Sequence, residues 1–287
     1  MALSKQDDTA DVVLSGEEHK DGLPCLISPV QRKTSTGRTL NEKEMEKLTG
    51  DQTLVSDFKQ MKLEKEAQKN WDLFYKRNTT NFFKDRHWTT REFEELKVCL
   101  EFEARKLVLL EAGCGVGNFI FPLLEEDLNI FVYACDFSPR AVEFVKEHSL
   151  YCTEGNVPVG SVDVATLIFV LSAIHPDKMQ QALDNIYRVL KPGGIILFRD
   201  YGLYDHAMMR FKAGNKLGEN FYVRQDGTSK SELSVSELLA DLFRVVGFES
   251  VTNEYVLRET VNKKEGLCVP RVFLQSKFRR PDQLQGS

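Results

Sequence analysis

A glycine-rich turn at residues 113–117 constrains the fold of this 287-residue chain more than any other feature. The turn reads Gly113, Cys114, Gly115, Val116, Gly117 and directly follows the apolar segment 107–110. Because glycine has no Cβ, the backbone there can turn sharply and approach a ligand closely. A short strand that runs into such a turn and then into a helix is typical of the first unit of a Rossmann-like α/β domain.

Extended and helical patterns alternate along the rest of the chain. We expect strands at residues 107–110, 130–135, 162–171 and 195–198, and helices at residues 116–125, 139–148, 177–190 and 234–246. Pro139 would be the first residue of its helix, Ser234 would cap the last helix, and the segment Lys191-Pro192-Gly193-Gly194 would form a turn. Residues 250–260 and 268–278 are expected to form an antiparallel hairpin. This alternation predicts an α/β fold with a mostly parallel sheet and ligands at the carboxyl ends of its strands.

We expect the α/β domain to span residues 106–278, with an insertion at residues 203–231 and a tail at residues 279–287. Residues 1–40 are polar and lack periodicity, which predicts a disordered tail. Residues 41–105 begin with a helical pattern that runs through Lys69, with Asn41 and Glu44 as its capping pair. They form a predicted N-terminal helical extension.

Composition excludes several classes of protein. The longest apolar run, residues 164–174, is too short to span a bilayer. The six cysteines form no Cys-x-x-Cys pair, so we expect no metal site. Acidic residues near the N-terminus argue against a transit peptide, and we expect the chain in the cytoplasm and also in the nucleus. The net charge is −5, so a polyanion would have to bind a local basic patch.

The spacing of the glycines indicates the cofactor. Dinucleotide-binding turns usually read Gly-x-Gly-x-x-Gly, but the sixth position here is Asn118. An acid followed by Gly-x-Gly-x-Gly is the variant found in methyltransferases, so we expect Gly113, Gly115 and Gly117 to bind S-adenosylmethionine. Asp136, at the end of the next strand, has the spacing of a carboxylate that accepts both ribose hydroxyls. NAD in place of S-adenosylmethionine, or an ordinary turn with a surface aspartate, are the alternatives.

Five blocks together resemble the transfer-RNA 3-methylcytidine methyltransferases: residues 68–75, residues 81–88, the glycine turn, residues 136–140 and residues 198–202. The resemblance covers residues 51–278 approximately and implies a Rossmann-like class I methyltransferase. It implies formation of 3-methylcytidine in the anticodon loop of a transfer RNA. It also implies serine transfer RNA as the substrate and seryl-tRNA synthetase as a partner.

The resemblance further implies that Trp71, Tyr75, Gly113, Asp136 and Ile168 line the cofactor site. Trp71 and Tyr75 are four residues apart and therefore share a helix face. An aromatic face suits a sulfonium cation or a stacked base. From the residues alone, packing of this face on the core is the alternative.

Two segments depart from the family pattern. Only residues 150–161 separate the helix ending near His148 from the strand at Val162, where the family has a further strand and helix. The acidic residue and leucine that meet the adenine in the family have no counterpart there. Residues 229–231 also replace aromatic residues of the family. These departures indicate a splice form or a divergent paralogue with weakened or absent activity.

Asp200 is the candidate catalytic residue, with Arg199 as its neighbour. Cytidine N3 already offers a lone pair, so alignment supplies most of the catalysis. The base becomes cationic as the methyl group arrives, and a fixed carboxylate would stabilise it. A structural ion pair between Arg199 and Asp200 is the alternative.

Basic residues interleaved with aromatic residues predict a surface for transfer RNA, although such runs can also be plain solvated faces. The predicted RNA-binding residues are Lys76, Arg77, Lys84, Arg86, Arg91 and Arg224. Further basic residues that could extend the patch are Arg210, Lys212, Lys216, Lys277, Arg279 and Arg280. Two other functions stay open: a methyltransferase for a protein or a small molecule, and an RNA- or synthetase-binding module without catalysis.

Overall fold

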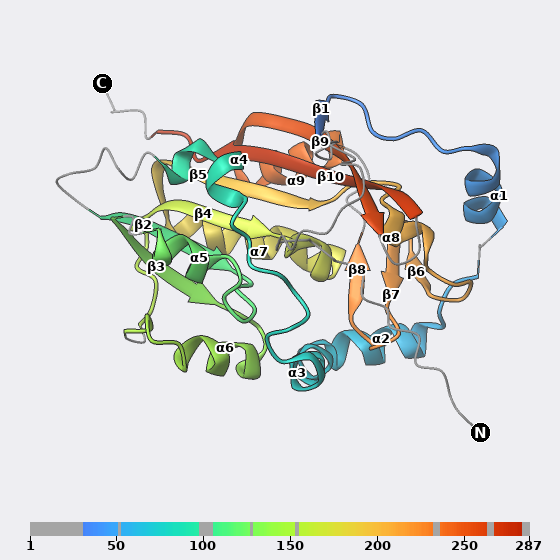
Figure 1. Cartoon of the computed structure of the whole chain (residues 1–287), viewed down its shortest axis with the longest axis horizontal. Coiled ribbons are helices and arrows are strands. Elements are labelled where there is room, and N and C mark those ends of the chain that lie inside the picture. Colours follow the sequence, from blue (N-terminus) through green and yellow to red (C-terminus); the bar gives the residue numbers. More distant parts are fainter. Residues whose placement is uncertain are drawn as a thin grey trace, which may run out of the picture.

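The computed structural model describes residues 31–50, 53–97, 106–126, 129–152, 155–231, 236–262 and 267–282. Its centre is one seven-stranded sheet (Figure 1). In spatial order the strands are β1 (Arg32–Thr34), β9 (Glu249–Asn262), β10 (Leu267–Arg279), β5 (Leu190–Tyr201), β4 (Val162–Ile168), β2 (Leu107–Ala112) and β3 (Ile130–Cys135). The strands β5, β4, β2 and β3 are parallel, whereas β10, β9 and β1 pair antiparallel. The predicted parallel sheet and C-terminal hairpin are confirmed.

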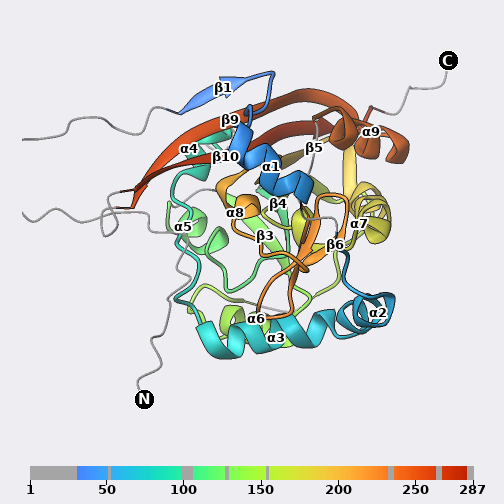
Figure 2. The same ribbon diagram turned by 90° about the vertical axis from the view of Figure 1, so that its right-hand side faces the viewer.

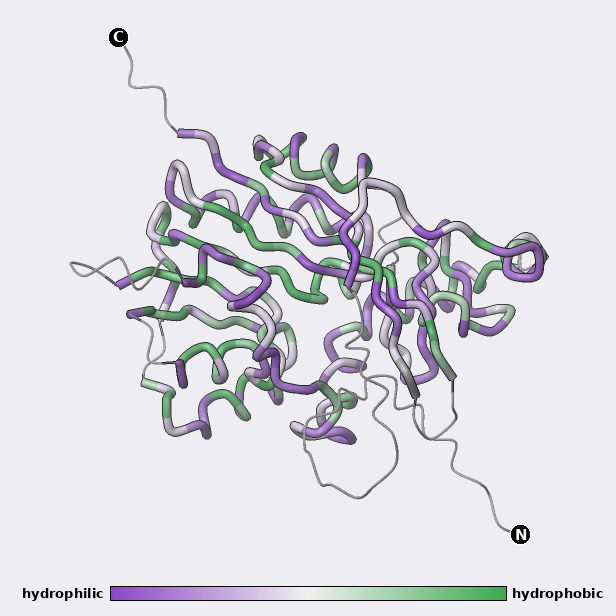
Figure 3. Tube along the Cα trace, turned by 45° about the horizontal axis from the view of Figure 1, so that its top comes forward, coloured by the Kyte–Doolittle hydropathy of each residue, from purple (hydrophilic) through white to green (hydrophobic). Residues whose placement is uncertain are grey.

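Helices cover both faces of this sheet. Successive strand residues point to opposite sides, and the central strands carry apolar side chains on both of them. Leu110 and Phe198 pack under α7 (Pro176–Val189) and α9 (Ser236–Val246). Leu109 and Leu197 face the other side, which is covered by α5 (Ile120–Glu125), α6 (Pro139–Lys146) and the segment containing Phe93. In Figure 3 the apolar colour concentrates in the central strands. The layered core thus fixes the carboxyl edge of β2, β4 and β5, where we expect the site.

The N-terminal extension consists of α1 (Glu42–Gly50), α2 (Asp57–Lys65) and α3 (Ala67–Asn78), with α2 and α3 in a row below the sheet (Figure 2). The predicted capping pair is confirmed, since Asn41 and Glu44 exchange backbone-to-side-chain hydrogen bonds of 3.1 and 2.9 Å. The helical pattern predicted from residue 41 through residue 69 forms helices, but the chain between α1 and α2 is interrupted by an extended segment. Leu54 bridges Lys216, and the N–H of Val55 donates to the carbonyl of Lys216 at 2.8 Å. This tertiary pairing holds the chain extended there and overrides local helix propensity.

The start of the chain also differs from the prediction. Residues 1–30 lie outside the described residues, but β1 within the predicted tail pairs with Tyr255, Val256 and Leu257 of β9. Gly37 then packs close to the ring of Tyr255. A Cβ at position 37 would lie 3.3 Å from ring atoms of Tyr255. A polar segment without periodicity is therefore held in place by the edge of the sheet.

Several element boundaries differ from the expected ones. Strand β4 ends at Ile168 rather than residue 171, and a 3-10 turn, Leu171–Ala173, follows it. Strand β5 already begins at Leu190, and the predicted glycine turn is an irregularity in its pairing with β4. The predicted cap Ser234 lies outside the described residues. Pro139 is the first residue of α6 as predicted, and Ser138, which was not predicted as a cap, caps this helix. The insertion forms α8 (His206–Met209) and a small sheet of β6 (Lys216–Gly218), β7 (Phe221–Val223) and β8 (Ser229–Ser231).

With this short connection between α6 and β4, β3 is the edge strand on the parallel side of the sheet, among the strands that the structure describes. The described residues of this connection, 147–152 and 155–161, form neither helix nor strand. Ala134 and Cys135, at the end of β3, are exposed. The expected absence of a further strand and helix therefore holds for the described part of the connection.

A buried ion pair anchors the insertion to the sheet and gives a stability prediction. The carboxylate of Asp205 accepts from Arg271 at 3.0 Å and from the N–H groups of Val272 and Ala207 at 2.8 and 2.9 Å. Asp205→Ala is expected to lower the free energy of unfolding by about 3–5 kcal/mol, because a buried pair loses one partner. Chemical denaturation would measure this loss. Asp241→Ala, which removes a pair with exposed Arg244 on α9, should cost less than about 1 kcal/mol; equal losses would contradict the prediction.

Candidate cofactor site and catalytic edge

The glycine turn follows β2 at the carboxyl edge of the sheet. Gly113, Gly115 and Gly117 have φ angles of 70°, 55° and 92°, in the left-handed region that favours glycine. A Cβ at Gly113 would lie 2.7 Å from the side chain of Val170, and one at Gly115 would lie 2.9 Å from the hydroxyl of Tyr75. Both the backbone conformation and the close packing therefore require glycine.

Asp136 ties this turn to the end of β3. Its carboxylate accepts hydrogen bonds from the N–H groups of Gly115 and Ser138, each at 2.8 Å. Burial raises the pKa of Asp136, while these two bonds lower it. The structure thus brings Asp136, the residue predicted to bind the ribose, next to the predicted glycines, although Asp136 lies 21 residues after Gly115 in the sequence.

Helix α3 covers the turn with its aromatic face. The rings of Trp71 and Tyr75 lie 6.2 Å apart, and Tyr75 packs with Val116 of the turn. Asp72 of the same helix accepts from the hydroxyl of Ser138 and the N–H of Arg140, both at 3.1 Å. Tyr75 is buried, and burial raises the pKa of its hydroxyl, so it is protonated at neutral pH. The shared helix face of Trp71 and Tyr75 is confirmed.

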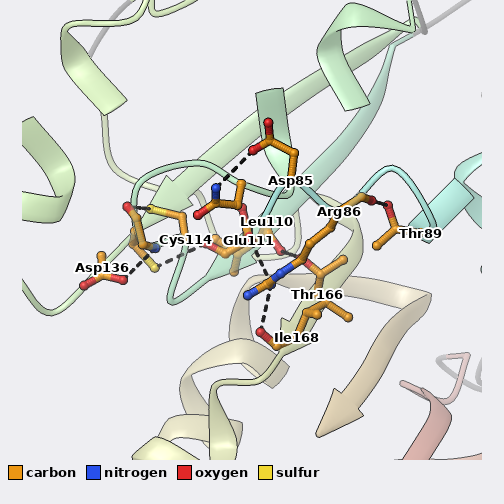
Figure 4. A network of polar contacts seen from close by, with 12 residues as sticks. Asp85, Arg86, Thr89, Leu110, Glu111, Cys114, Asp136, Thr166 and Ile168 are labelled. Atoms are coloured by element: carbon orange, nitrogen blue, oxygen red, sulfur yellow. Dashed lines mark hydrogen bonds and ion pairs between the residues drawn. The ribbon is translucent and has the colours of Figure 1, made fainter. Parts of the chain in front are cut away.

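Arg86 points into the site (Figure 4). Its guanidinium donates to the carbonyl of Ile168 at 3.0 Å and lies 4.0 Å from the carboxylate of Glu111. Only 14% of its side chain is exposed. Its backbone N–H also donates to the carbonyl of Asn118, directly after the turn, at 2.8 Å. The sequence suggested RNA contact for Arg86, but the structure packs it between β2 and β4.

Glu111 is the buried acid just before the glycine turn. One of its carboxylate oxygens, Oε2, is buried and has no hydrogen-bond partner. Burial raises the pKa of Glu111 to about 8, and the nearby Arg86 opposes this shift. An unpartnered buried oxygen next to the turn is a ready acceptor for a cationic or hydrogen-bond-donating ligand.

Arg199 and Asp200 lie just before the last residue of β5 and contact different groups. The carboxylate of Asp200 is fully buried and accepts from the N–H groups of Ser172 and Tyr201 at 2.9 and 2.8 Å. Arg199 donates to Gln275 at 2.9 Å, and burial lowers its pKa to about 10. Their alternative role as an ion pair is wrong, because neighbouring strand residues face opposite sides of the sheet. Burial raises the pKa of Asp200, while its hydrogen bonds with Ser172 lower it.

The predicted RNA-binding residues divide into two groups. Lys76, Arg77, Lys84 and Arg91 are exposed around α3 and the segment after it. Arg224 is half-buried, with its guanidinium over the rings of Phe74 and Phe82 at 5.8 and 5.6 Å. Together with the inward-facing Arg86, it stabilises the fold around the site. In the part of the chain that the structure describes, no cluster of histidine, cysteine, aspartate or glutamate could hold a metal ion.

These residues fit S-adenosylmethionine. The bare glycine turn allows close approach, Asp136 places a carboxylate beside it, and Glu111 offers an unpartnered oxygen. The parallel sheet with its antiparallel hairpin, together with this site, defines a class I S-adenosylmethionine-dependent methyltransferase. A chain of the solved complex between the Haloferax volcanii Trm112 methyltransferase activator and a methyltransferase shares the fold. Its TM-score is 0.51 at 14% identity, over 77% of this chain and 100% of that chain.

Comparison with known proteins narrows the class to a family. Residues 110–196 match the family model described as a methyltransferase domain. The chain is 68% identical over 270 residues to the tRNA N(3)-cytidine methyltransferase METTL6 of Homo sapiens, covering 89% of this chain and 95% of that protein. It is 43% identical to the tRNA N(3)-methylcytidine methyltransferase trm141 of Schizosaccharomyces pombe, covering 79% of this chain and 97% of that protein. The chain belongs to the tRNA N(3)-cytidine methyltransferase family, which confirms the predicted resemblance and makes S-adenosylmethionine rather than NAD the cofactor.

Two residues of the site carried no clear sequence signal. Arg86 stood among several basic residues, and its inward direction follows only from the docking of residues 82–88 on the turn. Phe169 follows β4 and has a φ of 60°, which sequence patterns do not reveal.

No described helix is both long enough and apolar enough to cross a membrane.

The raised pKa of Glu111 predicts proton release on cofactor binding. Since its pKa in the folded protein lies above the ordinary 4.5, the carboxyl is mostly protonated at pH 7. The cofactor carries an ammonium and a sulfonium group, and a positive charge beside Glu111 would favour the carboxylate. We expect up to about one proton to be released at pH 7, and affinity to rise with pH up to about 8.

Calorimetry in buffers of different ionisation enthalpy would measure this release. Glu111→Gln should abolish most of it, whereas Glu125→Gln, on the exposed end of α5, should leave it unchanged. Equal proton release in all three proteins would show that Glu111 is not the group that titrates.

Proposed function

We propose that this chain transfers the methyl group of S-adenosylmethionine to N3 of a cytidine in transfer RNA. The observation that carries the proposal is the family membership at 68% identity. In addition, the glycines of the turn adopt left-handed conformations, and the N–H of Gly115 donates to Asp136. The cofactor supplies an electrophilic methyl group. Gly113, Gly115, Gly117 and Asp136 would hold it, with Trp71, Tyr75 and Ile168 lining the site.

The finer substrate is proposed to be a cytidine in the anticodon loop of serine transfer RNA, with seryl-tRNA synthetase as the partner. Resemblance to the family supports this, and the exposed cations around α3 supply a surface for phosphate groups. We place the reaction in the cytoplasm and the nucleus, where transfer RNA is found. Methylation of purified serine, threonine and arginine transfer RNAs, each with and without the synthetase, tests the choice. Preferential methylation of serine transfer RNA supports it, and equal methylation of all three contradicts it.

Neutralising the exposed cations is expected to weaken RNA binding in a salt-dependent manner. The double variant Lys76→Gln, Arg77→Gln removes two exposed charges from the end of α3. The slope of log K against log salt should then decrease by about 1 for each phosphate that the protein no longer neutralises. Arg244→Gln, on α9 at the opposite face of the sheet, is the matched control and should keep the slope. An unchanged slope in the double variant would remove this surface from the RNA interface.

A binding module without catalysis is the second candidate, favoured by the short connection before β4. The 270 aligned positions cover 89% of 287 residues, so the alignment with METTL6 includes positions that have no counterpart in this chain. His148, at the start of the connection, stacks on Phe121 with ring centroids 3.6 Å apart. If the protein binds transfer RNA but calorimetric titration detects no binding of S-adenosylmethionine, this second candidate is favoured.

A further inference from the structure

Phe169 adopts a backbone conformation that phenylalanine rarely takes. It follows β4 directly, with a φ of 60°. A left-handed conformation is unfavourable for a non-glycine residue, and such residues concentrate at functional sites. The conformation is held on both sides. The N–H of Phe169 donates to the carbonyl of Arg199 at 2.8 Å, and the N–H of Ser172 donates to Asp200 at 2.9 Å.

This conformation places Phe169 between the cofactor turn and the end of β5. On one side, its neighbour Val170 packs on the bare α-carbon of Gly113. On the other side, its half-buried ring lies 4.9 Å from the ring of Tyr201 and 5.7 Å from that of Phe273. The guanidinium of Arg86 lies 5.4 Å from the centre of the Phe169 ring. Phe169 therefore borders both the cofactor turn and an aromatic cluster.

The base that receives the methyl group must lie next to the cofactor, on the same edge of the sheet. Aromatic side chains commonly bind splayed-out RNA bases by stacking. The methylated cytosine carries a positive charge, which an aromatic face also stabilises. Resting on the proposed function, we propose that Phe169, with Tyr201 beside it, is the platform on which the target cytosine stacks. Asp200 then acts as a positioning residue, because its carboxylate fixes the backbone of Ser172 and Tyr201.

Phe169→Leu removes the aromatic face and keeps an apolar side chain. Loss of stacking on one base, about 1–3 kcal/mol, corresponds to roughly 5- to 150-fold weaker binding of the target base. We expect kcat/KM for transfer RNA to fall within that range, whereas the affinity for S-adenosylhomocysteine changes less than threefold. Phe169→Tyr should retain most activity. Phe131→Leu, a half-buried phenylalanine on β3, is the matched control and should behave like wild type.

The direct readout is an RNA hairpin with the fluorescent analogue pyrrolocytidine at the target position. Wild type and Phe169→Tyr should quench its fluorescence by stacking, and Phe169→Leu should not. If Phe169→Leu does not fold, as judged by S-adenosylhomocysteine binding, Tyr201→Leu replaces it and should weaken quenching. Full quenching by the leucine variant, or no quenching by wild type, would overturn the platform. Quenching by a wild-type protein that methylates no RNA would support the platform and contradict the proposed function.

Discussion

Gly113→Ala is expected to weaken S-adenosylmethionine binding by at least about 100-fold, or about 2.8 kcal/mol. The new Cβ would lie 2.7 and 2.8 Å from the two methyl groups of Val170. Such contacts force the turn or the start of the 3-10 segment to move. The residue would also keep a φ near 70°, which alanine disfavours. Isothermal titration calorimetry measures the loss directly.

Gly160→Ala is the control variant, because it introduces the same backbone strain as Gly113→Ala without a steric clash. Gly160 has a φ of 62° but open space around its α-carbon. The variant should therefore lose some stability and bind the cofactor as wild type does. Cofactor affinity within threefold of wild type in Gly113→Ala would show that the close packing of this turn is not needed for binding.

Arg86→Met is the second substitution with a large expected effect. It leaves the buried carboxyl of Glu111 without its nearby cation and removes a hydrogen bond to the carbonyl of Ile168. Because the carboxyl of Glu111 is mostly neutral at pH 7, the main loss is the charged donor to the buried carbonyl of Ile168, which costs about 1–3 kcal/mol. Both the free energy of unfolding and the cofactor affinity should fall, while the salt dependence of RNA binding stays unchanged. Thermal denaturation with and without S-adenosylhomocysteine measures both effects.

Arg91→Met provides the opposite case in the same segment. Its side chain is 71% exposed, so we expect little change in stability and a reduced salt dependence of RNA binding. If Arg86→Met changed only the salt dependence, Arg86 would contact RNA as its sequence context suggests. The pair of variants thus decides which role Arg86 has.

Much of the architecture could be predicted from the sequence because it depends on local patterns. The glycine spacing located the turn, and Asp136 was placed beside it by its distance along the chain. The capping pair of Asn41 and Glu44 and the position of Pro139 at the start of α6 were predicted because a helix start depends on residues within one turn. The C-terminal hairpin was expected from two extended segments around a turn.

The features that were missed depend on contacts between distant segments. The helical pattern predicted through residue 69 is interrupted where Leu54 pairs with Lys216, and β1 forms because it can pair with the edge of β9. The inward direction of Arg86 results from the docking of its segment on Asn118. The enclosure of Asp200 and the strained backbone of Phe169 depend on the turn that joins β4 to the 3-10 segment. None of these arrangements leaves a periodic pattern in the sequence.

We propose that this chain, despite its short connection before β4, binds S-adenosylmethionine and methylates cytidine N3 in transfer RNA. The most direct test incubates the purified chain with S-adenosylmethionine carrying a labelled methyl group and serine transfer RNA, with seryl-tRNA synthetase present. The RNA is then digested and its nucleosides are separated by mass spectrometry. Label in 3-methylcytidine, lost in Gly113→Ala and retained in Gly160→Ala, is the predicted result. Label in another nucleoside, or none in RNA that the protein demonstrably binds, would contradict the claim.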